Sequence, residues 1–73
     1  MDELKLLLFM KMRVAKMDLD NVKRVLDKTQ PGDPTTAGLR SIRAARAERY
    51  NSLFELCSEA RLVNEYEEWV SER

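Results

Sequence analysis

Apolar residues recur at helical spacing along the first part of the chain. Between residues 8 and 26 the gaps between them alternate between four and three residues, which is the pattern of a coiled-coil seam. The seam consists of Leu8, Met12, Ala15, Leu19, Val22 and Leu26. This pattern predicts a helix over about residues 2–28. Asp18 or Asp20 could instead cap a new helix, which would break the first one near residues 17–20.

One segment interrupts the helical pattern. Pro31, Gly32 and Pro34 fall within four residues, and proline and glycine at this density mark a loop. We therefore expect a loop over about residues 29–36. Asp33 and Thr36 are both suited to cap a second helix, which the following residues predict over about 37–70.

The second predicted helix has an apolar face of its own. This face consists of Leu39, Ile42, Tyr50, Leu53, Leu56, Cys57, Ala60 and Val63. Two helices joined by a short polar loop favour an antiparallel hairpin. We predict an all-α fold, with residues 1–73 forming a single helical domain built as an antiparallel two-helix hairpin.

The charges agree with this hairpin. Folding about the loop brings the aspartates of the first helix near the arginines of the second, and the lysines near the glutamates. The first group is Asp18, Asp20 and Asp27 with Arg40, Arg43, Arg46 and Arg49. The second group is Lys5, Lys11 and Lys16 with Glu55, Glu59 and Glu65.

A second apolar row on the first helix has no partner in a two-helix fold. It consists of Leu6, Met10, Val14 and Met17. One antiparallel neighbour covers the seam but not both rows. A chain of 73 residues rarely gains more than about 3–5 kcal/mol from its own core. With one cysteine and no histidine, neither a disulfide nor a structural zinc site can add to that. We therefore expect dimerisation, or a partner's helices, to complete a four-helix bundle.

The last ten residues carry a further set of interface candidates. Tyr66, Trp69 and Val70 lie to the side of the apolar face of the second helix, and displaced aromatic residues often anchor interfaces. Four glutamates surround them. Carboxylates perform acid–base chemistry only in a sheltered cleft, so these glutamates indicate a solvated helix end.

Four arginines spaced by three residues form the strongest local signal. Arg40, Arg43, Arg46 and Arg49 spread over about half of the helix circumference. The favoured interpretation is that the stems of Arg46 and Arg49 pack while their guanidinium groups reach the aspartates of the first helix or a glutamate. The alternatives are a phosphate-contacting helix on which Tyr50 stacks, or a site for an acidic partner protein.

Composition narrows the function further. Basic and acidic residues both number 13, so overall charge gives no argument for nucleic acid or for an anionic membrane. The longest apolar run, residues 6–10, is far too short to span a membrane, and the acidic start does not resemble a secretory signal.

The sequence offers no activated nucleophile. Cys57 has no histidine to activate its thiol. We expect no enzyme activity, no cofactor and no metal site. The lone thiol favours a reducing compartment, the cytoplasm, with the nucleus also compatible.

Part of the second helix resembles a known family. The run Leu-Arg-Ser-Ile-Arg-Ala-Ala-Arg-Ala-Glu-Arg-Tyr at 39–50, with Glu-Tyr-Glu-Glu-Trp at 65–69, resembles the helical domain of GINS replication-complex subunits. The resemblance covers under half of the chain. Those subunits are longer and carry a small β domain that is absent here, so no functional residue is carried over.

The residues favour an assembly or adaptor protein that acts through protein–protein interaction and self-association, with a homodimer as its expected form. The alternative is a small nucleic-acid-associated factor that uses the arginine helix, such as a GINS-like helical subunit.

Overall fold

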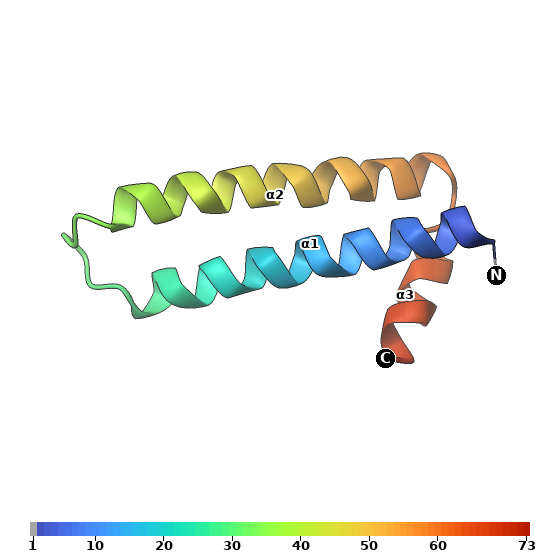
Figure 1. The fold of residues 1–73 in the computed structure, drawn as a ribbon, viewed down its shortest axis with the longest axis horizontal. Helices are drawn as coiled ribbons and strands as arrows, with labels where there is room; N and C mark the ends of the chain where they lie inside the picture. Colours follow the sequence, from blue (N-terminus) through green and yellow to red (C-terminus); the bar gives the residue numbers. More distant parts are fainter. Residues whose placement is uncertain (1) are drawn as a thin grey trace.

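The computed structural model describes residues 2–73, and they form three helices and no strand. The prediction of an all-α chain is therefore confirmed. The helices are α1 (Glu3–Lys28), α2 (Thr36–Glu59) and α3 (Val63–Ser71). Figure 1 shows α1 and α2 lying side by side in opposite directions, with α3 folded back onto the N-terminal part of α1. No helix in this described range is long and apolar enough to cross a membrane.

Helix α1 is capped at both ends and runs without a break. The Asp2 carboxylate accepts a hydrogen bond of 3.0 Å from the Leu4 N–H, and the Thr29 hydroxyl donates one of 2.7 Å to the Val25 carbonyl. The alternative break near residues 17–20 does not occur. The four central members of the predicted seam are buried, and its two ends are half-buried. The buried members are Met12, Ala15, Leu19 and Val22.

The loop between α1 and α2 is built from two hydrogen-bonded turns. Gly32 has φ 92°, and the Asp33 N–H donates to the Gln30 carbonyl at 3.1 Å, so Pro31 and Gly32 form the centre of a type II turn. The Asp33 carboxylate accepts from the backbone N–H and the hydroxyl of Thr35, at 2.9 and 2.8 Å. These bonds lower the pKa of the Asp33 carboxyl. Thr35 occupies the N-cap position of α2 but makes no side-chain capping bond. The Asp33 carboxylate, one of the two predicted caps, is the side chain that accepts a backbone N–H at this helix start, and Thr36 is not the cap.

The predicted second helix over residues 37–70 is wrong at its C-terminal part, because the chain turns at residues 60–62. The Leu62 N–H donates to the Cys57 carbonyl at 2.9 Å, and the Arg61 N–H donates to the Ser58 carbonyl at 3.0 Å. These two bonds form a Schellman motif. Its left-handed position, usually a glycine, is occupied by Arg61 with φ 59°.

Helix lengths explain why the chain turns there. Helix α1 is 26 residues long, and α2 runs antiparallel to it from Thr36. At the same rise per residue, α2 comes level with the first turn of α1 near residue 61. A straight continuation would project past the start of α1, where Tyr66 and Trp69 would have nothing to pack against. The turn buries both side chains, and this burial offsets the roughly 1–2 kcal/mol cost of the left-handed Arg61.

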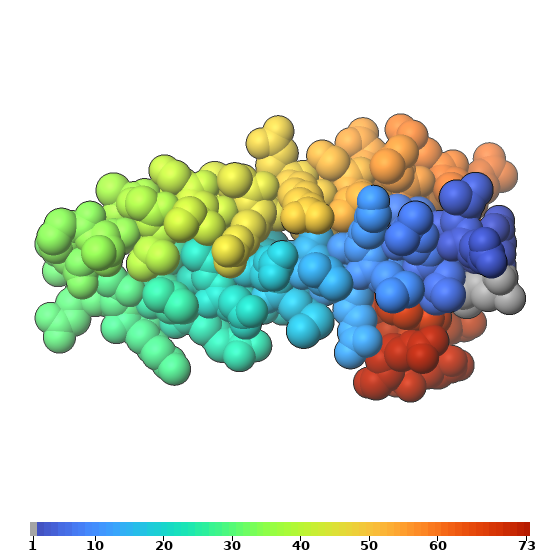
Figure 2. Space-filling model, in the orientation of Figure 1, coloured from blue at the N-terminus to red at the C-terminus, as the bar shows by residue number. Residues whose placement is uncertain are grey.

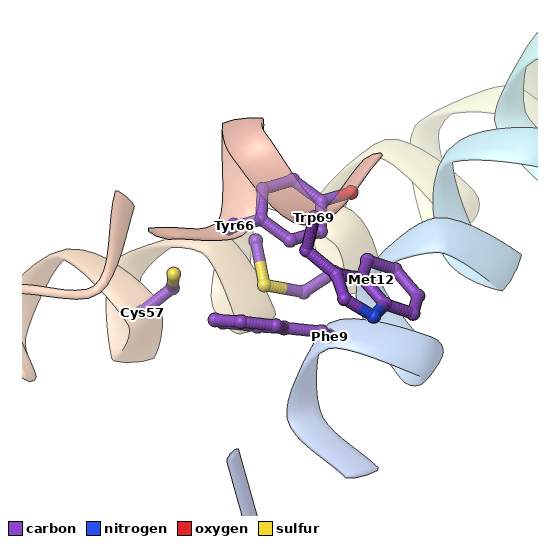
Figure 3. Close-up of a cluster of buried hydrophobic side chains, with 5 residues drawn as sticks. All are labelled: Phe9, Met12, Cys57, Tyr66 and Trp69. Atoms are coloured by element: carbon purple, nitrogen blue, oxygen red, sulfur yellow. The ribbon is translucent and has the colours of Figure 1, made fainter. Parts of the chain in front are cut away.

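The main core lies where all three helices meet. It contains Phe9, Met12, Cys57, Tyr66 and Trp69. Figure 3 shows the side chains from α1 and α3 converging there. The Phe9 ring lies 5.5 Å from the Tyr66 ring at an interplanar angle of 60° and 5.8 Å from the Trp69 ring, measured between centroids. This core sits at one end of a molecule that measures 47 × 22 × 17 Å, away from the loop.

Candidate partner-binding groove

The second apolar row of α1 is uncovered along most of its length. The exposed fractions are 51% for Met10, 51% for Val14 and 54% for Met17. Leu6 is half-buried and packs against the main core. Figure 2 shows α3, in red, lying against only the N-terminal part of α1. The row therefore begins at the core and continues into solvent.

The row forms the floor of a groove. The groove has a volume of about 480 Å³ and is lined by Leu6, Met10, Arg13, Val14, Met17, Trp69 and Arg73. Helix α1 supplies five of these residues, and Trp69 supplies a wall from α3. The row runs over 12 residues, from Leu6 to Met17, and its ends lie roughly 16 Å apart along the helix, so the groove has the length of about three turns of a docked helix.

Among residues 2–73, the charged residues that line the groove are two arginines, Arg13 and Arg73. The Arg73 guanidinium lies 4.8 Å from the centre of the Trp69 ring, a cation–π contact. Over residues 2–73, the ion pairs within 4.0 Å are Lys5–Glu65 and Lys16–Asp20. Neither Arg13 nor Arg73 therefore has a carboxylate within 4.0 Å in the described residues, and the groove combines an apolar floor with two cations that form no ion pair.

Trp69 adds an unpaired donor beside this groove. Its indole Nε1 is buried without a hydrogen-bond partner in the described part of the chain. A buried donor without an acceptor costs about 1–3 kcal/mol. Glu65, Glu68 and Glu72 line a second cavity together with Trp69, but none of them accepts a hydrogen bond from the indole N–H.

The aromatic interface candidates occupy a different place from the predicted one. Tyr66 and Trp69 are 7% and 6% exposed and belong to the chain's own core. Val70 is 36% exposed and stays on the surface. The turn at residues 60–62 places both rings against α1, so of the three predicted interface candidates only Val70 is exposed. Trp69 nevertheless lies beside the apolar row, because it lines the same groove.

The four arginines of α2 do not form the predicted ion pairs with aspartates. All four are exposed, and none lies within 4.0 Å of a carboxylate among residues 2–73. Arg46 crosses to α1, where its guanidinium donates to the backbone carbonyl of Asp18 at 3.0 Å. Arg40 and Arg43 line a cavity of about 250 Å³ beside the loop, together with Asp27.

The lysine–glutamate prediction holds for one pair. Lys5 and Glu65 form an ion pair of 2.7 Å that links α1 to α3. Lys16 instead pairs with Asp20 on its own helix at 3.4 Å, and its ammonium lies 5.6 Å from the Tyr50 ring centre. Exposed pairs of this kind contribute about 0–1 kcal/mol each, so they orient the helices more than they stabilise them.

Cys57 and Tyr66 are the other groups with shifted acidity. Burial raises the pKa of the Cys57 thiol, and Cys57 is fully enclosed in the core. Burial also raises the pKa of Tyr66, with smaller contributions from Tyr50 and Cys57, while the charge of Arg13 lowers it. Both groups stay neutral at pH 7, and a buried neutral thiol is a poor nucleophile.

Sequence reasoning identified the apolar row but missed two features of its surroundings. Phe9 was not assigned to any face, although it is fully buried. Arg13 and Arg73 were not recognised as lining residues. The position of Arg13 could have been predicted from a helical wheel, because Arg13 is three residues after Met10 and four before Met17 and therefore lies on the same side of α1. The position of Arg73 in the groove depends on how α3 folds back onto α1, and the pattern of apolar and polar residues does not predict it.

Comparisons of the chain with protein-family models, with curated proteins and with solved structures found no match. The resemblance of residues 39–50 to GINS subunits gains no support from them.

Proposed function

We propose that this chain is a non-enzymatic assembly or adaptor protein that binds the helices of another chain along the second row of α1. The other chain is a partner protein or a second copy, and binding completes a four-helix bundle around the α1–α2 hairpin. The observation that carries this proposal is the groove, whose floor contains three half-exposed apolar side chains. Helix-in-groove docking is a common mode of recognition for such a surface.

The energetics support a binding role for the row. Fully burying one large apolar side chain contributes about 1.5–3 kcal/mol. Covering the exposed halves of Met10, Val14 and Met17 would therefore contribute roughly 2–4 kcal/mol. This amount is similar to the roughly 3–5 kcal/mol that a core of this size supplies on its own.

Without a partner, the isolated chain is expected to self-associate weakly through this row, with an unfolding midpoint that rises with concentration. Replacing Leu6 and Met10 together with alanine should weaken the association more than it lowers the helix content, because alanine favours helix while Leu6 also packs against the main core. Light scattering across a concentration series and circular dichroism measure the two properties. Leu4→Ala is the control, since Leu4 is 76% exposed and outside the groove. A double variant with unchanged mass and midpoint would show that the row does not mediate self-association.

A second function is supported by the unpaired arginines of α2. Arginine suits bidentate contacts with phosphates, so this helix is a candidate surface for a nucleic-acid backbone. We expect the double variant Arg40→Ala and Arg43→Ala to lose weak, salt-dependent binding to a short DNA or RNA duplex, measured by fluorescence anisotropy between 50 and 200 mM salt. Binding that does not depend on salt, or that survives the double variant, would count against this function.

A further inference from the structure

We propose that the groove receives an acidic amphipathic helix from a different protein. This inference rests on the proposed function and specifies the chemistry of the partner. Apolar side chains of that helix cover Met10, Val14 and Met17, and carboxylates beside them face Arg13 and Arg73.

Charge is the first argument for an acidic occupant. Arg13 and Arg73 are the only charged residues that line the groove, and neither has a carboxylate within 4.0 Å in residues 2–73. A docked helix removes water from both guanidinium groups, and a charge that loses water without gaining a partner is costly. Carboxylates on the occupant remove this cost, and lysines would increase it.

The place of Arg73 on Trp69 is the second argument. Trp69 lines the groove, and the Arg73 guanidinium lies 4.8 Å from the centre of its ring, so this cation sits beside the apolar floor. A carboxylate on the occupant that meets Arg73 therefore lies next to the apolar side chains that cover the row. An acidic amphipathic helix thus matches the apolar floor and the two cations together.

A second copy fits the groove less well. The large apolar side chains exposed on α2 are Ile42 and Leu56, and on α3 only Val70 among the described residues. None of these sets forms a row that matches the groove. The α1 row of a second copy would match it in polarity. A two-fold antiparallel pairing centred on the row, however, places the two copies of Arg13 on the same side and about 4 Å apart along the helix axis. Like charges at that spacing oppose a tight dimer.

Three designed peptides test the inference on the full chain. Each is an 18-residue helix with the same leucine row and no tryptophan, and the flanking positions carry glutamate, glutamine or lysine. Trp69 is the only tryptophan of the chain and lines the groove, so its fluorescence reports binding. We expect the glutamate peptide to bind about tenfold more tightly than the lysine peptide at 50 mM salt, a difference that shrinks at 500 mM.

Two variants locate the binding. Arg13→Glu should remove or reverse the preference for the glutamate peptide, and Val14→Asp should abolish binding of all three. Lys23→Glu is the matched control, because Lys23 is an exposed cation of α1 outside the groove. It should leave the preference unchanged.

The remaining outcomes separate the inference from the proposed function. Equal binding of all three peptides, abolished by Val14→Asp, would overturn the acidic partner and retain the binding role of the row. Failure of every peptide to bind, with a tight dimer that Val14→Asp dissociates, would show that a second copy fills the groove and would also overturn the inference. A chain that binds no peptide and stays monomeric would overturn both.

Discussion

Replacing Phe9 with alanine is expected to leave most molecules unfolded at 25 °C. Phe9 is 0% exposed and contacts both aromatic rings of α3. Truncating a buried phenylalanine costs about 3–5 kcal/mol, which equals the whole stability that a core of this size usually supplies. Loss of the circular dichroism signal at 222 nm and a red shift of the Trp69 fluorescence measure the result.

Leu4→Ala is the matched control on the same helix, because its side chain is 76% exposed. It should change the free energy of unfolding by less than about 0.5 kcal/mol. A Phe9→Ala variant whose urea midpoint stays near that of the control would show that α3 does not depend on this contact.

The two ends of the helix pair are expected to differ strongly in hydrogen exchange. The buried aromatic side chains lie at the end of the helix pair where α3 docks. Towards the loop, the buried side chains of α1 are Leu19 and Val22, and the residues of α2 at that end are half-buried or exposed. Fully buried large side chains contribute about 1.5–3 kcal/mol each. A difference of one such side chain corresponds to roughly 10- to 100-fold in exchange protection.

Amides of residues 10–15 and 53–57 should therefore exchange more slowly, by this factor, than those of residues 22–28 and 39–45. Exchange measured residue by residue by NMR, or by mass spectrometry after proteolysis, gives both sets in one sample. Equal protection at the two ends would mean that the helix pair opens as one unit and that the loop end is as stable as the core.

The pattern of α1 was sufficient to predict its fold and its exposed row. Met12, Ala15, Leu19 and Val22 are buried, and Met10, Val14 and Met17 are half-exposed. Both results follow from helical periodicity, because one antiparallel neighbour covers only one side of a helix. Local information was enough here, since every residue involved lies on one uninterrupted helix.

The break before α3 could not be predicted in the same way. Helical periodicity continues through residues 60–62, and the left-handed position is occupied by Arg61 instead of a glycine. The turn forms because Tyr66 and Trp69 gain burial on Phe9, a contact between residues almost sixty positions apart. The position of Arg73 in the groove depends on the same contact.

The arginine prediction failed for a different reason. Folding about the loop does bring α2 close to the aspartates of α1, but Arg46 donates to the backbone carbonyl of Asp18 and not to a carboxylate. Exposed ion pairs gain little over hydration, so charge patterning predicts which helices are neighbours more reliably than which atoms pair.

The position of the chain ends has a practical consequence for anyone who attaches a tag to this protein. The first described residues and the C-terminus both lie at the end that carries α3, while the loop over residues 29–35 lies at the other end of the 47 Å long axis. A fluorophore or affinity tag fused directly after Arg73 would adjoin one of the groove's lining residues and would compete for that surface. The exposed loop at Gly32 and Asp33 is the better attachment point, because small insertions at loop tips are well tolerated and this one is remote from the groove.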